Sequence, residues 1–454
     1  MTTAVVLFTR DLRVHDNPTL RAAMDRADRV VPLFVLDRRI LDSDYFRPNR
    51  AAFLADSLAD LHDALSERGA KLLVRRGRLT DEVVRVARES SADAVVMSGD
   101  VSGYAQRREA ALREALEAQG VELQVCRETN FVVPAGAITP DGGDHMRVFT
   151  PYFRRWEDRP VRDVLGAPRT LEAVSLKSAA DDAIAGLRLG TTSPKLARGG
   201  EQEGRRRMRE WVREGIDAYE DGHDDLAGDQ TSRLSPYLHF GCLSPVELVQ
   251  LARERGGPGA EAFVRQVAWR DFHAQVLAAR PDAVRADYRP RGDRWQRDDD
   301  GLEAWRAGRT GFPIVDAGMR QLAEEGWMHN RARLIVAHFL TKTLYLDWRL
   351  GAAHFIDLLV DGDVANNTMN WQWVAGTGTD TRPNRMYNMT LQAQRHDPSG
   401  DYVRRYVPEL RGVAGGAVHE PWKLPEDERA TLDYPERIVD PDFARERFRR
   451  ARGK

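Results

Sequence analysis

The sequence predicts an α/β domain with a doubly wound parallel sheet of five strands, joined by a long linker to an all-α domain. Three observations support this fold class. Over residues 1–130, short apolar runs alternate with helix-patterned stretches, which is typical of a parallel sheet with helices on both faces. Over residues 131–200, proline and glycine interrupt the pattern. Over residues 201–454, helical periodicity replaces the strand signal.

The five expected strands read as short, largely apolar runs, as strands buried on both faces do. They are Ala4–Phe8, Val30–Leu36, Lys71–Arg75, Ala94–Met97 and Glu122–Cys126. Helical spacing between them places helices at Ala51–Glu67 and Tyr104–Ala118. No Gly-x-Gly-x-x-Gly follows the first strand, so the standard dinucleotide fingerprint is absent.

Helices are also expected in the remainder of the chain. Within the linker, Val148–Trp156 is expected to form one ordered helix docked on a domain. Beyond the linker, the apolar periodicity indicates helices at Gly204–Tyr219, Pro245–Arg255, Ala260–Ala279, Asp316–Glu325, Asn330–Asp347 and Ala352–Val360. The chain after Gly376 contains more proline and glycine and is expected to be less regular.

The composition indicates a soluble globular protein, with 42% hydrophobic and 30% charged residues among 454. Neither a membrane-length apolar run nor a signal peptide is visible, so we expect a cytoplasmic protein. Cys126 and Cys242 form no metal-binding spacing and suggest no disulfide framework, and no metal site is predicted. The net charge of −2 gives no global argument for nucleic acid, although local basic patches can still bind it.

Seven of the ten tryptophans fall between Trp269 and Trp373. The ordinary explanation is a tryptophan-rich helical core, because most buried aromatic side chains serve packing. The alternative is a site that handles aromatic partners or electrons.

Four segments could carry chemistry. The run Asp229–His239 offers hydroxyls before a helix, which suit either a phosphate or a plain helix cap. The turn Asp361–Asp363 could bind ribose hydroxyls or end a helix, and the amides that follow could bond a cofactor ring. The run Gly326–Arg333 opens a helix that carries Arg331 and Arg333. One of these arginines could pair with Asp361 while the other faces a phosphate, or both could be solvated. Gln266, Trp269, Arg270 and His273 share one helical stripe that could line a base-stacking cavity.

Taken together, the motifs resemble the DNA photolyase/cryptochrome family, and most closely the class I cyclobutane pyrimidine dimer photolyases of actinobacterial type. The resemblance runs nearly the whole length of the chain. The matching motifs are Phe8–Arg13 (FTRDLR), Thr231–Pro236 (TSRLSP), Trp269–Phe272 (WRDF), Gly311–Asp316 (GFPIVD), Trp327–Arg331 (WMHNR), Asp361–Asp363 (DGD), Asn370–Trp373 (NWQW) and His419–Trp422 (HEPW).

The resemblance implies FAD, bound in a folded form inside the helical domain. The residues implied on the phosphate side are Tyr219, Thr231, Ser232, Arg233, Leu234 and Ser235. Asp361, Gly362 and Asp363 would hold the ribityl and ribose side, and Arg333 would pair with Asp361 near the isoalloxazine ring. Asn367 would sit at the flavin N5.

The resemblance also implies an electron-transfer chain through Trp371 next to the flavin, Trp348 in the middle and Trp295 at the surface. The substrate would be UV-damaged DNA, with a flipped-out dimer split by light-driven electron transfer from reduced FAD. The residues implied for the lesion pocket are Gln266, Trp269, Arg270, Asn330, Arg331, Leu334 and Trp373. Trp269 and Trp373 would stack on the dimer, and Arg331 would hold flanking phosphates.

An antenna chromophore is implied in the N-terminal domain, next to Arg50 and Asp100. These residues favour 8-hydroxy-5-deazaflavin over methenyltetrahydrofolate. A monomer is expected.

The sequence departs from the usual family pattern at Gln266, where many members carry Glu, and at Leu334, where Met is usual. A larger departure lies at Met389, Ala393 and His396, where the family usually has Pro, Gly and Phe. The loss of Pro and Gly is expected to change the backbone near the pocket.

The first functional hypothesis is therefore repair of cyclobutane dimers. The alternative is a cryptochrome-like photoreceptor that photoreduces FAD without repair, although the chain stops at Lys454 without an extended tail. A (6-4) photolyase ranks third, because that activity is expected to need a histidine pair where Asn330 and Leu334 stand.

Overall fold

Five parallel strands form one sheet in the order β3-β2-β1-β4-β5 in the computed structural model, which describes residues 1–178 and 180–453. The strands are β1 (Thr3–Phe8), β2 (Arg29–Asp37), β3 (Leu73–Gly77), β4 (Ala94–Ser98) and β5 (Glu122–Cys126). The predicted doubly wound sheet is confirmed, with β3 shifted two residues beyond its expected start. In the centre of the sheet, Val5 of β1 pairs with Val31 on one side and Val95 on the other.

Helices cover both faces of the sheet. Val5 and Leu7 of β1 pack in one core with residues of α4 and α5, whereas Val6 and Phe8 pack in another with residues of α1 and α3. The helices of this layer are α1 (Pro18–Arg26), α2 (Arg38–Leu41), α3 (Pro48–Ser66), α4 (Leu79–Glu89) and α5 (Gly103–Glu117). Because the central strands are covered on both faces, most of their positions favour apolar side chains, which explains the continuous runs in the sequence. The edge strands β3 and β5 carry exposed polar residues such as Arg76 and Glu122.

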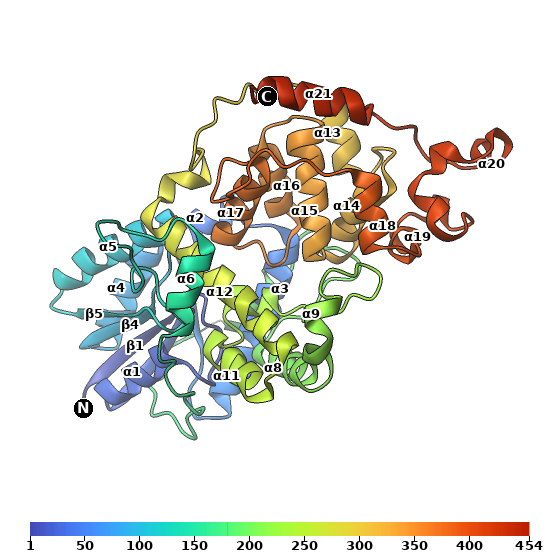
Figure 1. The fold of residues 1–454 in the computed structure, drawn as a ribbon. Coiled ribbons are helices and arrows are strands. Elements are labelled where there is room, and N and C mark those ends of the chain that lie inside the picture. The colour runs from blue at the N-terminus through green and yellow to red at the C-terminus, as the bar shows by residue number, and fades with distance from the viewer. Residues whose placement is uncertain (179, 454) are drawn as a thin grey trace.

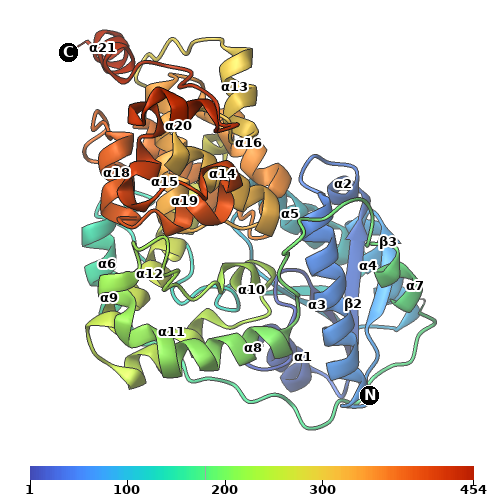
Figure 2. The ribbon, with the colours of Figure 1, turned by 90° about the vertical axis from the view of Figure 1, so that its right-hand side faces the viewer.

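The helical layer lies beside the sheet layer, and the two chain ends lie at opposite ends of the molecule (Figures 1 and 2). Its helices are α8 (Glu201–Glu210), α9 (Tyr219–Gly222), α10 (Ser235–Phe240), α11 (Pro245–Arg255), α12 (Pro258–Ala279), α13 (Asp299–Arg306), α14 (Pro313–Glu325), α15 (Asn330–His338), α16 (Trp348–Leu358), α17 (Val364–Ala375), α18 (Met389–His396), α19 (Asp401–Tyr406), α20 (Glu426–Ala430) and α21 (Pro441–Ala451). None of the helices in the described chain is long and apolar enough to cross a membrane.

Two expected helices are interrupted. The helix expected over 204–219 continues from α8 as a π-helical segment, Trp211–Gly215, where the glycine lies directly under the Trp211 ring. The helix expected over 330–347 changes to π-helix at Phe339–Thr343 and then stops. It stops because Tyr345 adopts a left-handed conformation with φ 59° and Asp347 caps the next helix.

The linker and the tail contain more structure than expected. In the linker, α6 (Phe149–Glu157) forms as predicted and packs on α12, and a second helix, α7 (Ala180–Ala185), packs on β3 and α3. The tail after Gly376 is less regular, as expected, but it still contains the short helices α18 to α21, which were not predicted individually. Their short length and flanking prolines hid the helical periodicity.

Arg13 joins the sheet layer to the helical layer. Its buried guanidinium donates to the carbonyl oxygens of Asp16 (2.9 Å), Thr129 (2.6 Å) and Gly241 (2.9 Å), and the side chain is 1% exposed. Arg13→Ala is expected to lower the free energy of unfolding by roughly 3–6 kcal/mol, because the buried acceptors would lose a charged donor. Urea unfolding measures this change.

The matched control is Arg21→Ala, which removes an exposed arginine paired only with Asp25 on the surface of α1. It should change the stability by less than about 0.5 kcal/mol. Equal unfolding midpoints for the two variants would contradict the role given to Arg13.

Candidate functional site

One large cavity, of about 420 Å³, lies inside the helical layer between α9, α12, α15 and α17. Most residues predicted for the cofactor and the substrate line it. They are Tyr219, Thr231, Ser232, Arg233, Leu234, Ser235, Gln266, Trp269, Arg270, Asn330, Arg333, Leu334, Asp361, Asp363, Asn367, Trp371 and Trp373. The predicted residues outside this lining are Arg50, Asp100, Trp295, Arg331, Trp348 and Gly362. The cavity thus brings the two predicted sets of residues together.

Asp361 anchors one wall of the cavity. Its carboxylate accepts hydrogen bonds from the Arg333 guanidinium at 2.8 and 3.1 Å and from the Ser235 hydroxyl at 2.5 Å. The side chain of Asp361 is buried, so the ion pair and the hydroxyl replace the water that it has lost. Of the two arginines weighed for this pairing, Arg333 is therefore the one that makes it.

Asp363 connects the cavity to the sheet layer. Arg10, which follows β1, donates to the Asp363 carboxylate at 2.6 Å, and Asp100, which follows β4, lies 3.4 Å from the same guanidinium. Burial alone would raise the pKa of Asp363, but the positive charge of Arg10 outweighs it and holds the pKa well below the usual value. The carboxylate of Asp363 is therefore ionised at neutral pH.

Gly362 lies between the two carboxylates, at a point where the layers approach closely. Its carbonyl accepts a hydrogen bond from the Tyr45 hydroxyl at 3.1 Å. A Cβ atom at this position would lie 3.0 Å from the Arg50 guanidinium. Gly362 thus serves the contact between layers rather than the wall of the cavity.

The run Thr231–Ser235 forms the hydroxyl-bearing wall. Arg233 adopts φ 50°, and its guanidinium bonds Asp229 and Glu325, both at 2.7 Å. The hydroxyl of Ser232 accepts a hydrogen bond from the Leu234 amide at 3.4 Å. Because α10 has only six residues, its dipole is short, and the hydroxyls are the main polar feature of this wall.

The predicted stripe on α12 faces the cavity, but two of its members are held by protein contacts. Trp269 stacks on Phe149 of α6, with ring centroids 3.7 Å apart. Arg270 donates to the carbonyl oxygens of Asn130 at 2.6 Å and Leu238 at 3.3 Å. Both side chains are therefore fixed before any ligand binds.

Arg331 faces away from the cavity lining. Its guanidinium forms a two-point ion pair with Asp224, with donor–acceptor distances of 2.9 and 2.5 Å. A phosphate contact by Arg331 would have to compete with this pair. The sequence could not reveal the partner, because Asp224 lies 107 residues away in a turn after α9.

The three tryptophans predicted for electron transfer run from the cavity toward the surface. Trp371 lines the cavity and is 2% exposed, and its ring meets Phe355 edge to face at 4.9 Å. Trp348 is 1% exposed and donates from its indole nitrogen to Asp287 at 2.9 Å. Trp295 is partly exposed and lies 5.0 Å from Tyr345.

The resemblance implies no role in electron transfer or lesion binding for Trp305 and Trp327, which leaves packing as the ordinary explanation for both. Trp305 is fully buried, and its indole nitrogen donates to the Val336 carbonyl, which agrees with packing. For Trp327 the packing interpretation is incomplete, because it lines the cavity and donates to the Ser235 hydroxyl at 3.1 Å. Trp327 also lies under the Arg233 guanidinium, a contact that no local sequence pattern signals.

Asn367 has an orientation fixed by the helix that faces it. Its amide nitrogen donates to the Ala352 carbonyl at 3.0 Å, so its amide oxygen is left as an acceptor on the cavity side. The neighbouring Asn366 accepts a hydrogen bond from His273 Nδ1 at its amide oxygen and donates one from its amide nitrogen to the Asp363 carboxylate.

His273 lines the cavity with an open polar atom. Its Nε2 is buried and has no hydrogen-bond partner in the part of the chain that the structure describes. A buried nitrogen in this position is costly unless a ligand meets it. Together with the hydroxyl wall and the two carboxylates, it fits a large polar cofactor.

Three histidines, the buried His273 and His329 and the partly buried His354, give the protein a defined pH dependence. Burial lowers the pKa of each to about 4. Each histidine binds a proton in the unfolded chain below its ordinary pKa of 6.5 but stays neutral in the folded protein. Its contribution to the free energy of unfolding is therefore complete above pH 6.5 and is lost as the pH falls toward 4. The free energy of unfolding is expected to fall by about 1 kcal/mol for each histidine between pH 7 and pH 5.5.

Urea unfolding at several pH values measures this loss, and His354→Gln provides the comparison. The variant should lose about 1 kcal/mol less than the parent over the same interval. An identical pH dependence in both proteins would contradict the shifted pKa of His354.

The comparisons with known proteins cover the whole chain. Residues 4–169 match the family model described as DNA photolyase, and residues 263–454 match the model described as FAD binding domain of DNA photolyase. A deoxyribodipyrimidine photo-lyase of Streptomyces griseus is 59% identical over 100% of both chains, and one of Halobacterium salinarum is 37% identical over 98% of both.

Two solved structures extend this likeness to the fold. A bacterial class III photolyase from Agrobacterium tumefaciens superposes with a TM-score of 0.93 at 32% identity, covering 100% of this chain and 97% of that one. A cryptochrome of Synechocystis superposes with a TM-score of 0.90 at 27% identity, covering 99% of both chains.

Proposed function

We infer the function from the fact that this chain belongs to the DNA photolyase family, with a FAD binding domain formed by its helical layer. We propose that it is a deoxyribodipyrimidine photolyase, which uses blue or near-UV light to split cyclobutane pyrimidine dimers in DNA. The observation that carries the proposal is the membership of one cavity. Trp371 and Asn367 line it, and so do Trp269 and Trp373. It combines an electron-transfer residue, a polar cofactor site and aromatic faces for bases.

The residues present fit FAD. The hydroxyls of Thr231 and Ser232 would meet the phosphates, with Ser235 beside them donating its hydroxyl proton to Asp361. The carboxylates of Asp361 and Asp363 would meet ribityl and ribose hydroxyls. Reduced FAD supplies, when excited by light, the electron that opens the cyclobutane ring and then returns. The free amide oxygen of Asn367 would accept a hydrogen bond from the protonated N5 of the reduced ring.

The pair of Arg333 and Asp361 has a further role in this arrangement. Arg333 also donates to the Met328 carbonyl at 2.8 Å, so its guanidinium is held at a fixed place in the wall. The positive charge of Arg333 would stabilise negative charge on the reduced isoalloxazine ring, and Asp361 would keep the arginine oriented.

The lesion pocket would be the outer part of the cavity. Trp269, already stacked on Phe149, offers a rigid face, and Trp373 offers a second one. Gln266, Asn330 and Leu334 would surround the flipped dimer, with Gln266 able to donate and accept hydrogen bonds. Each stacked base would return ~1–3 kcal/mol, which offsets the cost of flipping.

The largest departures from the usual family pattern lie together in α18. Met389 is the first residue of this helix, a position where proline and methionine both fit the backbone. Ala393 and His396 continue the same regular helix, and both are buried. All three residues therefore lie in one regular helix, which is capped by the Asn388 side chain.

A repair assay tests the function. The purified, prereduced protein is incubated under blue light with an oligonucleotide that contains a thymine dimer, and restored thymine is measured against a dark control. We expect repair only in the light. Normal flavin photoreduction without repair would favour the alternative, a cryptochrome-like photoreceptor.

An antenna in the sheet layer remains part of the proposal. We propose 8-hydroxy-5-deazaflavin rather than methenyltetrahydrofolate, bound near Arg50 and Asp100. Arg50 donates to the Leu359 carbonyl at 2.6 Å and Asp100 pairs with Arg10, so both residues mark the edge where the layers meet. Absorption spectra of the purified protein, after reconstitution with each chromophore, distinguish the two. A cytoplasmic monomer acting on UV-damaged DNA completes the proposal.

A further inference from the structure

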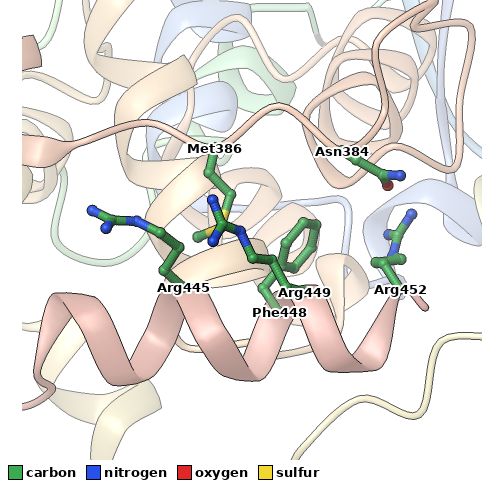
Figure 3. Close-up of a pocket in the computed structure, with 6 residues that line it drawn as sticks. All are labelled: Asn384, Met386, Arg445, Phe448, Arg449 and Arg452. Atoms are coloured by element: carbon green, nitrogen blue, oxygen red, sulfur yellow. The ribbon is translucent and has the colours of Figure 1, made fainter. Parts of the chain in front are cut away.

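A second cavity, of about 370 Å³, lies between α21 and the loop residues 384–386, outside the lining of the cofactor cavity. Its lining combines arginines with two apolar side chains. The residues are Asn384, Met386, Arg445, Phe448, Arg449 and Arg452. Figure 3 shows the three arginines extending from α21 toward the loop that carries Met386 and Asn384.

The arginines of this cavity are not all neutralised. Arg445 pairs with the exposed Asp442 at 3.0 Å, and Arg452 lies 2.7 Å from Asp293. Arg449 is exposed and has neither an ion pair nor a hydrogen bond within the described residues. Arg452 is 4% exposed at its side chain, and its Nη1 is buried with no hydrogen-bond partner there. The cavity therefore presents unused N–H donors and excess positive charge.

The loop beside the cavity adds to this charge. Arg382 and Arg385 are exposed on it, and neither side chain has a carboxylate partner among the described residues. The ammonium group of Lys342 donates a hydrogen bond to the Arg385 carbonyl at 2.7 Å and so fixes the loop to the helical layer. Such a concentration of guanidinium groups favours a phosphate, which they can bind in a two-point geometry.

The loop joins this cavity to the proposed lesion pocket. Arg452 donates to the carbonyl of Ala375, the last residue of α17, two residues after Trp373. At its other end the loop is fixed by Tyr387, whose ring stacks on His338 of α15 at 4.4 Å. The loop is therefore fixed at both ends, to the two helices that carry Trp373 and Leu334.

We propose that this cavity binds a backbone phosphate of the DNA strand that continues beyond the lesion. The proposal rests on the proposed function and extends its DNA contact surface onto α21. Arg382 and Arg385 would meet phosphates along the loop, and Arg449 and Arg452 would bind the one that enters the cavity. The apolar Phe448 and Met386 suit the sugar beside it.

The test measures the affinity for a dimer-containing duplex, with one helical turn on each side of the lesion, over a range of salt concentrations. Arg449→Ala should weaken binding about three- to tenfold at low salt and reduce the slope of log K against log salt by about 0.9, the value for one phosphate contact. Arg449→Lys should restore most of the slope, because it keeps the charge. FAD content and photoreduction should not change.

Arg450→Ala is the matched control, because Arg450 is the next residue on α21, is exposed and pairs with Glu446 outside the cavity. It should leave the slope at the wild-type value. Equal slopes for Arg449→Ala and Arg450→Ala would overturn the proposal. Binding of inorganic phosphate that depends on Arg449, seen by phosphorus NMR without an effect on the duplex, would also overturn the assignment to DNA.

The isolated thymine dimer dinucleotide separates this proposal from the proposed function. It is too short to reach α21, so the wild type and Arg449→Ala should repair it equally. Failure of the wild type to repair it would contradict the function, whereas an effect of Arg449 on duplex binding would still support the phosphate site. Slower repair of the dinucleotide by Arg449→Ala would contradict the site.

Discussion

Replacing Trp371 with phenylalanine is expected to abolish photoreduction of the bound flavin while leaving flavin binding intact. Trp371 lines the cofactor cavity, and its buried ring presses on Gly351, where a Cβ atom would lie 2.1 Å from the indole. Phenylalanine keeps an aromatic ring in this space but is much harder to oxidise. The packing loss is about 1–2 kcal/mol, too little to unfold the site. Absorbance of oxidised flavin under anaerobic blue light measures the effect.

Trp305→Phe is the matched control for this variant. Trp305 lies 6.1 Å from Trp371 between ring centroids and is equally buried, so the change in side-chain volume is the same. Because Trp305 lies outside the lining of the cavity, its variant should photoreduce flavin at close to the parent rate. Wild-type photoreduction by Trp371→Phe would show that the electron path is wrongly assigned.

Replacing Trp373 with alanine is expected to weaken binding of dimer-containing DNA by roughly 10- to 100-fold, because one stacked base is worth ~1–3 kcal/mol. Flavin photoreduction should remain, since Trp371 is left in place. Trp373 is a cleaner test than Trp269, because Trp269 also stacks on Phe149 and its loss would disturb α6. Fluorescence anisotropy with a labelled oligonucleotide measures the affinity.

Trp422→Ala serves as the comparison. Trp422 is a partly buried tryptophan that packs near Phe312 and lies outside the lining of the cavity. Its replacement should leave DNA affinity within about twofold, as expected for a site distant from the ligand. If both variants bind the lesion equally well, Trp373 does not stack on it.

The sequence predicted those parts of the fold that rest on local patterns. The strands were visible because β1 and its neighbours are buried on both faces and so carry apolar residues at most positions. Helix α11 was predicted at its observed bounds, because Ser244 and Pro245 mark its start and glycine its end. The interruption near Tyr345 escaped prediction, since a non-glycine residue in the left-handed region has no reliable sequence signal.

The sequence predicted which residues belong to the site, but not most of the contacts that hold them there. The residues of the cavity came from motif resemblance, and the structure gathers most of them. The contacts of these residues depend on the tertiary fold. Asp224 forms an ion pair with Arg331, Arg10 forms one with Asp363, and Phe149 stacks on Trp269. Such pairs join distant parts of the chain that no local sequence pattern connects, whereas the pair of Arg333 and Asp361 was expected from the resemblance.

The contact between Arg10 and Asp363 has a consequence for how the protein is made. The two residues are 353 positions apart, and Asp363 also caps α17, the helix that carries Asn367 and Trp371. During synthesis, Arg10 leaves the ribosome long before its partner exists. The last residue that lines the cofactor cavity is Val374, so the cavity can close, and the flavin can be held, only after the chain has been made as far as α17.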